Sequence, residues 1–505
     1  MIKAIILNTI LKKAIVIGAG FSGLSAASFL ARAGWQVTVI EKHPSPGGRA
    51  RRFTEKGFTF DMGPSWYWMP DVFERYFASF GKEVTDYYSL KRLDPSYSVM
   101  WEDARMDLPA GYGALRDLFD RMEPGSGARL DRFLQGAAYK YEVGMHKLVR
   151  KPGRSWTELL DPDVIRGVFR LDVFSPVSRH IRKYFRHPKI RQLLEFPVLF
   201  LGALPSRIPA LYSLMNYADI RGGTWYPEHG IYRVIESMHA LAMELGVQFR
   251  FGENVTGFDI PGRTVTGVAG TDASGDRHSY ETDVVVASAD YHFVERALVP
   301  AHLRSYPESY WSKRVLAPSC LLYYVGLDKR LPSMPHHLLF FDTDFAQHGA
   351  EIYESRQWPH RPLFYVSAPS VSDDSVAPEG CENLFFLIPV ASGLQGDTAE
   401  LRDRYFDAIL ARFEDRIGEP VRKNIIFQKS YGPSDFVSDY NAYQGNAYGL
   451  ANTLMQTALF KPSCRSKKIK NLFYTGQFTV PGPGVPPALI SGEVVAGEVV
   501  RRCSI

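Results

Sequence analysis

The sequence predicts an α/β protein in which a Rossmann-like unit begins near the N-terminus and a second, α+β domain is inserted into that unit. Three observations lead to this class. Strand-like and helical segments alternate from residue 14, helical periods rich in Arg and Lys dominate residues 107–219, and residues 471–505 return to a strand, a Gly/Pro loop and a small-residue helix. With 505 residues, 45% of them hydrophobic, the chain has ample material for several cores.

The N-terminal unit is predicted over residues 14–41. An apolar strand over 14–17, a helix of small residues over 24–33 and a second strand over 36–40, closed by Glu41, make a βαβ unit of the usual size. A glycine-rich turn between a strand and a helix is the arrangement that binds the phosphates of a dinucleotide.

That turn carries the pattern GxGxxG. Gly18 allows the sharp turn, Gly20 lets the backbone approach a pyrophosphate, and Gly23 lets the helix pack closely on the strand. The helix N-terminus offers free N–H groups to the phosphates, and Glu41 can accept hydrogen bonds from both hydroxyls of an unphosphorylated ribose. The string alone also arises in glycine-rich helix packing, so the strand–turn–helix context carries the prediction of a dinucleotide site.

The next segment favours FAD over NAD. Gly48 and Arg49 follow Glu41 and Lys42, which we assign to the same site, and they offer a second backbone loop with a guanidinium. FAD is long and extended and needs such further contacts, with Arg49 either neutralising the pyrophosphate or lying beside the flavin. The alternative is a solvated turn that is rich in arginine.

The remaining elements divide between two domains. A strand is expected over 58–61, a helix and strand over 233–251, further strands over 264–270 and 283–288 with a turn at Gly275, and alternating strands and helices over 302–429. We predict a discontinuous FAD-binding domain (12–106, 220–300 and 430–505) and a substrate and membrane-docking domain (107–219 and 301–429).

Several motifs resemble one family. At residues 18–49 the chain resembles the superfamily of flavin amine oxidases and carotenoid desaturases, and FDMGPSWY at 60–67 is similar to a stretch of bacterial phytoene desaturases. Further similar stretches follow in family order: RGGTWYP at 221–227, SADY at 288–291, and LFYTGQ with PGPGVP at 472–486. The resemblance covers about residues 13–501 and implies the fold of the two-dinucleotide-binding-domain flavoproteins.

The resemblance also implies site residues. Gly476 and Gln477 match the positions that bind the ribityl-phosphate region of FAD, and three residues match positions near the isoalloxazine and the following helix, namely Val485, Pro486 and Ala488. Val255 would lie on the adenine side, and Pro64 with Ser65 would line the flavin from the N-terminal side.

The chain departs from the family pattern at two places. Arg52 replaces the last Ser or Thr of the GGRxx(S/T) pattern, and Glu228 and His229 interrupt the YPxGG stretch. We hypothesise that Glu228 or His229 lies near the reacting carbon; the alternative is a pair of surface loop residues.

The implied reaction is the desaturation of a phytoene-like carotenoid by hydride transfer to flavin N5, with oxygen or a quinone as the final electron acceptor. The protein then positions the chain, excludes water and offers a weak base, which agrees with the absence of a recognisable Ser-His-Asp or Cys-His set. A polyene needs an apolar, aromatic tunnel, and 13% of the residues are aromatic. Residues 196–203 and 208–217 are candidates for the tunnel mouth, with ordinary core helices as the alternative.

The charge pattern bears on partners. A net charge of +5 gives no reason to expect nucleic acid. Basic and aromatic residues alternate over 147–191, which fits peripheral docking on an anionic membrane, although a charged helical face gives the same pattern. The uncharged runs 14–31 and 471–492 contain too many glycines or prolines for membrane spans. Four cysteines without a CxxC pair predict neither a disulfide framework nor a metal site, and they fit a cytoplasmic protein.

Other functions remain open from the sequence. Within enzymes, the chain could act on a later carotenoid intermediate or be an amine oxidase, whose flavin-facing Lys and aromatic cage we cannot assign. Outside enzymes, the same fold could serve as a non-catalytic carrier of prenyl lipids, as in the GDP-dissociation inhibitors. The complete FAD fingerprint around Gly18 and Glu41 argues against a carrier.

Overall fold

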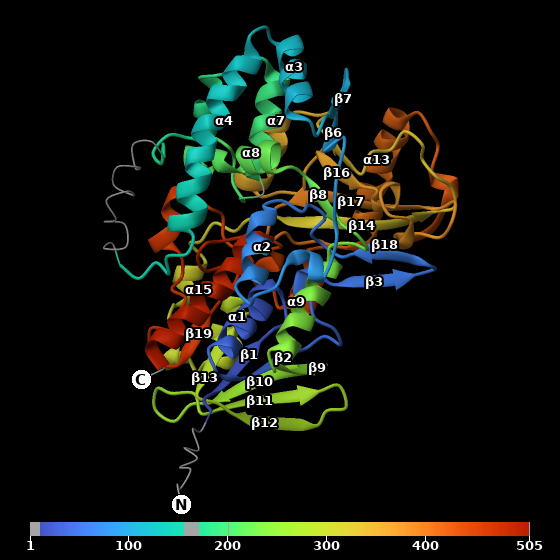
Figure 1. Ribbon diagram of the computed structural model, residues 1–505. Coiled ribbons are helices and arrows are strands. Elements are labelled where there is room, and N and C mark those ends of the chain that lie inside the picture. Colours follow the sequence, from blue (N-terminus) through green and yellow to red (C-terminus); the bar gives the residue numbers. More distant parts are fainter. Residues whose placement is uncertain (1–10, 156–170, 200, 504–505) are drawn as a thin grey trace, which may run out of the picture.

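The computed structural model describes residues 11–155, 171–199 and 201–503 (Figure 1). A parallel sheet with its helices forms one half of the molecule, and a larger mixed sheet with helix α13 (Ala399–Ile417) and a group of helices forms the other. The predicted α/β class is confirmed.

The first half is built on a five-stranded sheet with the order β19-β13-β1-β2-β9, in which all neighbours are parallel. Its inner strands are continuous runs of Val, Ile and Ala buried on both faces, as parallel strands require. The sheet joins three segments that are far apart in the sequence. The first supplies β1 (Lys13–Ile17) and β2 (Gln36–Glu41), the second β9 (Gln248–Phe251) and β13 (Val284–Ala287), and the third β19 (Leu472–Tyr474).

Close packing of three helices completes this half: α1 (Phe21–Arg32), α9 (Tyr232–Glu244) and α15 (Val485–Cys503). A methyl group on Gly23 would lie 2.0 Å from the carbonyl oxygen of Gly18, and one on Gly492 would lie 2.5 Å from that of Ser22. Glycine at position 23 therefore allows α1 to approach the turn that follows β1, and glycine at position 492 allows α15 to approach α1.

Antiparallel strands β10 (Glu253–Asp259), β11 (Gly267–Asp272) and β12 (Arg277–Glu281) form a separate sheet beside the parallel one. The predicted turn at Gly275 is confirmed, because this residue has a φ of +90° between β11 and β12. Two short ribbons pair β3 (Arg52–Glu55) with β4 (Phe58–Asp61) and β5 (Leu90–Arg92) with β8 (Trp225–Pro227).

The second half is built on a seven-stranded sheet. Its order is β18-β14-β17-β16-β15-β6-β7, with a single parallel pair between β15 and β6. The strands are β6 (Tyr97–Met100), β7 (Arg105–Leu108), β14 (Ser319–Leu327), β15 (His337–Phe340), β16 (Phe364–Ser367), β17 (Glu382–Val390) and β18 (Ile425–Tyr431).

This sheet corrects the predicted domain boundary at residue 106. Strands β6 and β7 begin inside the range 12–106 predicted for the FAD-binding domain, but β6 pairs with β15 and with β7 in the seven-stranded sheet. A strand belongs to the domain whose strands it pairs with, and a short segment of alternating residues does not reveal which strands those are.

Alternation along the strands gives this sheet two apolar faces. Leu338 and Phe340 point into a core shared with Phe406 and Phe413 of α13, whereas Leu339, between them, points to the opposite side. That opposite side is where the cavity described below lies.

The helical segment predicted over 107–219 is present. It contains α3 (Tyr112–Met122), α4 (Ser126–Val143), α6 (Val177–Arg182), α7 (Pro188–Leu199) and α8 (Leu214–Tyr217). Further α-helices of the described residues are α2 (Pro70–Ala78), α10 (Tyr291–Phe293), α11 (Glu308–Trp311), α12 (Phe345–Ala350) and α14 (Pro433–Tyr440). Among the residues described, no helix has the length and apolar character needed to cross a membrane.

Candidate cofactor and substrate cavity

A cavity between the two halves is lined by residues from distant parts of the chain. Of the residues predicted to bind the cofactor, all except Gly23 line it: Gly18, Gly20, Glu41, Lys42, Gly48, Arg49, Pro64, Ser65, Val255, Gly476, Gln477, Val485, Pro486 and Ala488. Gly23 lies behind the turn, where it serves helix packing as predicted.

The glycine-rich turn has the shape of an anion cradle. Gly18 has a φ of +98°, its N–H donates to the carbonyl of Ile40 at 2.8 Å, and no side chain caps the first turn of α1. A methyl group on Gly48 would lie 3.3 Å from the Cα of Gly20, so the two glycine loops meet face to face. Free helix N–H groups beside bare backbone suit a pyrophosphate.

Glu41 is held in one orientation at the end of β2. It is 5% exposed, its Oε2 accepts from the N–H of Ala19 at 2.8 Å, and its Oε1 accepts from the N–H of His43 at 2.9 Å. Each carboxylate oxygen keeps a further lone pair for a ribose hydroxyl. The backbone of β10 around Val255 lines the same end of the cavity.

Arg49 offers a buried positive charge to the cavity. Its guanidinium donates to the carbonyl of Asn446 at 3.3 Å and lies over the ring of Tyr440, while its Nε has no hydrogen-bond partner. Burial lowers the pKa of Arg49, and the nearby carboxylate of Asp290 opposes that shift. A buried cation with an unpartnered N–H inside a cavity fits an anionic ligand, and so the residues present fit FAD.

The C-terminal motif closes the cavity from the other side. Gly476 has a φ of +107° and a methyl group there would lie 3.1 Å from the hydroxyl of Ser22, while its N–H donates to Ser491. Gln477 donates to the Oδ1 of Asn446 at 3.0 Å, and α15 begins at Val485 on the cavity wall. The N- and C-terminal motifs therefore meet around one ligand position.

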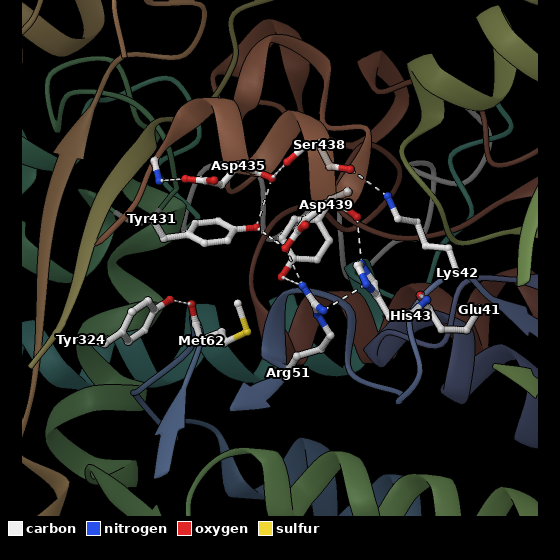
Figure 2. Close-up of polar contacts among 12 residues, drawn as sticks. Glu41, Lys42, His43, Arg51, Met62, Tyr324, Tyr431, Asp435, Ser438 and Asp439 are labelled. Carbon is white, nitrogen blue, oxygen red and sulfur yellow. Dashed lines mark hydrogen bonds and ion pairs between the residues drawn. The ribbon is translucent and has the colours of Figure 1, made fainter. Parts of the chain in front are cut away.

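Lys42 lines the cavity and also contacts helix α14. Its Nζ donates to the carbonyl of Ser438 at the end of α14, 2.9 Å away, so this ammonium group contacts the helix (Figure 2). Sequence reasoning did not identify α14, although Phe436, Asp439 and Tyr440 also line the cavity.

An apolar arm continues from Pro64 and Ser65. We use this name for the following lining residues: Trp66, Trp68, Phe196, Leu199, Leu201, Leu204, Leu339, Phe341, Phe345, Ile352, Tyr353, Leu363, Phe364, Tyr365, Leu387 and Tyr448. The predicted tunnel segment 196–203 contributes Phe196, Leu199 and Leu201, whereas no residue of 208–217 is among the lining residues. Such a wall suits a long hydrocarbon.

Most polar groups in the arm are already engaged. His348 accepts from the N–H of Leu363 at 3.0 Å and lies 3.2 Å from the carbonyl of Pro389, so both ring nitrogens have partners. Burial raises the pKa of the Cys320 thiol to about 12, which leaves it protonated. Neither group is suited to accept a proton from a ligand.

One hydrogen-bonded series reaches the junction of the two parts of the cavity. The hydroxyl of Tyr365 donates to the Oγ of Ser65 at 3.0 Å and lies 2.6 Å from the Nδ1 of His337. His337 is 1% exposed, stacks on Trp66 with ring centroids 4.1 Å apart, and has no partner for its Nε2. Burial holds the pKa of His337 well below its usual range, so the ring is neutral.

Glu228 and His229 do not line the main cavity, contrary to the hypothesis that one lies near the reacting carbon. Both are exposed on the turn after β8, where the N–H of His229 donates to Asp373 at 2.7 Å. His229 lines a small separate pocket whose inner end reaches Ser65. His229 occupies a left-handed position, with a φ of 72°, and its Nδ1 lies 2.9 Å from the Oγ of Ser375.

The carboxylate of the FDMGPS motif also has a structural role. Asp61 accepts from the N–H groups of Ile231 and Tyr232 at 2.7 and 3.0 Å, and so caps the start of α9. The motif therefore fixes α9 against the ribbon that carries Pro64 and Ser65 into the cavity.

The comparisons with known proteins agree with this site. The family model described as flavin containing amine oxidoreductase matches residues 21–500. A carotenoid 3,4-desaturase of Haloarcula japonica is 40% identical over 96% of this chain and 97% of its own length. A zeta-carotene-forming phytoene desaturase of Myxococcus xanthus is 31% identical over 97% of this chain and 94% of its own length.

Solved structures share the fold at low identity. An oxidoreductase from Methanosarcina mazei has a TM-score of 0.62 at 16% identity and covers 96% of this chain and 100% of its own. A putrescine oxidase has a TM-score of 0.60 at 14% identity, covering 97% and 99% of the two chains. A Rab GDI from Plasmodium falciparum has a TM-score of 0.56 at 11% identity, covering 97% and 98%. The fold is thus shared by oxidases and by a GDI, and the fold alone does not separate them.

Full-length identity to carotenoid desaturases, together with a cavity that fits FAD, is decisive for the family. The chain belongs to the flavin-containing amine oxidoreductase family and, within it, to the carotenoid desaturases, FAD-dependent oxidoreductases that act on CH–CH groups.

Proposed function

We propose that the protein desaturates a carotenoid, and that its preferred step is the introduction of a double bond at the 3,4 position. The observation that carries the desaturase proposal is the apolar arm, which opens directly from the cofactor end of the same cavity. The 3,4 position is favoured because the identity to the 3,4-desaturase is 40%, compared with 31% for the phytoene desaturase. Phytoene, the substrate expected from the sequence motifs, is the competing candidate.

The proposed reaction removes two hydrogens from adjacent carbons of a polyene. When bound, FAD supplies the two-electron acceptor for this step, and we propose oxygen or a quinone as the acceptor that reoxidises it. The arm holds the chain and excludes water. The position that loses its electron pair becomes a strongly acidic allylic cation, and therefore a weak base is sufficient to take the proton.

We assign that base to the series Ser65, Tyr365 and His337. Ser65 lines the cavity at the junction of cofactor end and arm, and Tyr365 joins it to His337. The proton passes to the Oγ of Ser65, and the C–H electron pair becomes the new double bond. With Tyr365 donating to Ser65, the Nδ1 of the neutral His337 ring carries the ring proton and donates to Tyr365. Transfer on to Nδ1 therefore requires the tautomer with the ring proton on Nε2, which has no partner, and both hydroxyls turned toward the ring. His337 is neutral and buried, so it accepts the proton only transiently and releases it again.

Peripheral attachment to the cytoplasmic face of a membrane belongs to the same proposal, because a carotenoid dissolves in lipid. Phe174, within the basic stretch 147–191, is 80% exposed, and Met455 is 64% exposed. Some of the charge is used internally, since Arg150 and Arg154 pair with Glu493 and Glu498 of α15. Trp156, Arg166, Phe169 and Arg170 of the predicted cluster lie outside the described residues.

Membrane attachment is tested by flotation with vesicles that contain anionic lipid. We expect the protein to float with them, and to do so less at high salt because screening weakens the basic contribution. Sedimentation without the vesicles at both low and high salt would contradict docking.

The substrate is tested by expression in two cell lines, one that accumulates phytoene and one that accumulates a carotenoid whose 3,4 bond is single. We expect a red-shifted pigment in the second line, because one further conjugated double bond forms. Conversion of phytoene alone would shift the proposal to the earlier step. No new pigment in either line, with the purified protein binding FAD, would favour an amine oxidase; a colourless protein would favour a lipid carrier.

A further inference from the structure

Helix α14 separates the cofactor end of the cavity from solvent. On its inner side Phe436 and Tyr440 line the cavity, and on its outer side Val437 is 48% exposed. The wall is therefore one helix thick beside Glu41, where the ribose of FAD would lie. A bound FAD could not leave on this side unless α14 moved.

The start of α14 is anchored to the half with the seven-stranded sheet. The N–H and hydroxyl of Ser434 both donate to Asp397 at 2.9 Å, and Asp435 pairs with Arg402 at 2.7 Å. Asp397 precedes α13 and Arg402 lies in its first turns, so this end follows the substrate half of the molecule.

The end of α14 is held by the other half, through the loop that follows β2 (Figure 2). Lys42 donates to the carbonyl of Ser438, and the Nε2 of His43 donates to the carbonyl of Asp439, both at 2.9 Å. Arg51 donates to the carboxylate of Asp439 at 2.7 Å. Lys42 and His43 thus contact the last carbonyls of the helix, where its dipole is negative, and Arg51 pairs with the carboxylate of its penultimate residue.

The same contacts fix the protonation of the loop. Because the Nε2 of His43 donates to a carbonyl, its Nδ1 is the acceptor for Arg51, 3.0 Å away, and the ring is neutral. The hydroxyl of Tyr431 also donates to Asp439 at 3.0 Å. Arg51 is 14% exposed, so its ion pair with Asp439 is largely shielded from water.

We propose that Lys42, His43 and Arg51 form a latch on helix α14, and that this latch retains FAD by keeping the wall of its site closed. The three residues are positioning residues that act through α14. The loop suits this role because His43 also donates its backbone N–H to Glu41, so the ribose-binding carboxylate and the latch move together. The proposal rests on FAD being the resident cofactor of this family.

The test measures the release of FAD from the purified holoprotein, followed by the rise of flavin fluorescence after dilution. We expect Asp439→Asn and Arg51→Gln each to speed release about 10-fold, because a shielded ion pair is lost. The double variant should release FAD no faster than either single variant, since both remove one interaction. The matched control is Asp407→Asn on α13, which breaks an exposed ion pair with Arg422 and should leave FAD release unchanged.

Two outcomes would overturn the latch. Unchanged release in Asp439→Asn would show that α14 does not retain the cofactor. Faster release in Arg51→Gln with no change in Asp439→Asn would show that Arg51 holds FAD directly. If Asp439→Asn does not fold, Tyr431→Phe replaces it: this variant removes only one hydrogen bond to Asp439, and we expect release to be two- to threefold faster.

Discussion

The two ends of the cavity are built by different means. At the cofactor end the ligand position is surrounded by backbone: two glycine loops, free N–H groups and a carboxylate held by main-chain donors. In the apolar arm it is surrounded by side chains from several helices and from one face of the seven-stranded sheet. The cofactor end therefore depends on a few positions at fixed spacing, and the arm on the sum of many contacts. Substitutions at the cofactor end should abolish FAD binding, and substitutions in the arm should change the preference among carotenoid substrates.

The largest effect is expected for Gly23→Ala, which attacks the cofactor end. The added methyl group would lie 2.0 Å from the carbonyl oxygen of Gly18, so the turn must shift and the phosphate cradle opens. We expect at least about a 100-fold loss of FAD affinity, measured by flavin absorbance of the purified protein. Gly113→Ala, a glycine in α3 with open space around it, is the control and should bind FAD normally.

The next largest effect is expected at the junction between the cofactor end and the arm. Tyr365→Phe breaks the path from Ser65 to His337 while keeping the ring, and we expect turnover to fall about 100-fold with FAD content unchanged. Single-turnover reduction of the flavin separates this chemical step from product release. His337→Phe should give a loss of the same size, and full activity in either variant would reject the series as the base.

A smaller effect is expected in the arm. Phe345→Ala removes one half-buried ring from α12, and we expect KM for the carotenoid to rise about 10-fold while FAD binding is unaffected. Met243→Ala, which truncates an exposed side chain outside the cavity, is the control. An unchanged KM in Phe345→Ala would mean that the substrate does not reach this part of the arm.

Acid should loosen the cofactor end. Burial, followed by Arg51, lowers the pKa of His43; Lys42 acts in the same direction, whereas Glu41 and the carbonyl of Asp439 oppose it. Because the pKa of His43 is lower in the closed latch than in the opened one, His43 takes up a proton more readily once the latch has opened. The latch is therefore intact above pH 6.5 and weakens as the pH falls below that value. We expect FAD release to accelerate a few-fold on that side, and His43→Gln, whose side chain does not titrate, to remove the dependence.

A rise of the pH from acid to neutral should instead destabilise the packing behind the arm. Asp219 accepts from Tyr97 at 2.9 Å behind Trp66, and burial raises its pKa to about 7. A raised pKa means that the folded state holds a proton that the unfolded state has already lost, so stability declines from about pH 4 to pH 7 as the pH rises. Asp219→Asn should gain melting temperature over the wild type across this range, and a constant difference would contradict the assignment.

The cofactor end could be predicted from the sequence to a large extent. Gly18, Gly20, Glu41 and the motifs around Ser65 and Gly476 act through local backbone geometry, which spacing along the chain reports. The position of a dinucleotide between the first strand and helix follows from those residues alone, and the structure places the predicted residues around one cavity.

The arm and the latch could not be predicted in this way. Tyr365, His337 and Asp439 are ordinary residues whose roles depend on strands and helices far away in the chain. Glu228 and His229 illustrate the reverse case: their departure from a motif suggested a catalytic role, yet both are exposed on the turn after β8 and neither lines the main cavity.

Dinucleotide binding through the glycine-rich turn can be predicted from the sequence, because the main-chain atoms that carry this chemistry lie within about 30 residues of one another along the chain. Three features are visible only in the tertiary structure: Tyr365 and His337 meet beside Ser65, β6 and β7 belong to the seven-stranded sheet, and α14 lines the cofactor end of the cavity. These features arise from contacts between distant segments, and their energy is distributed over packing that no short pattern encodes.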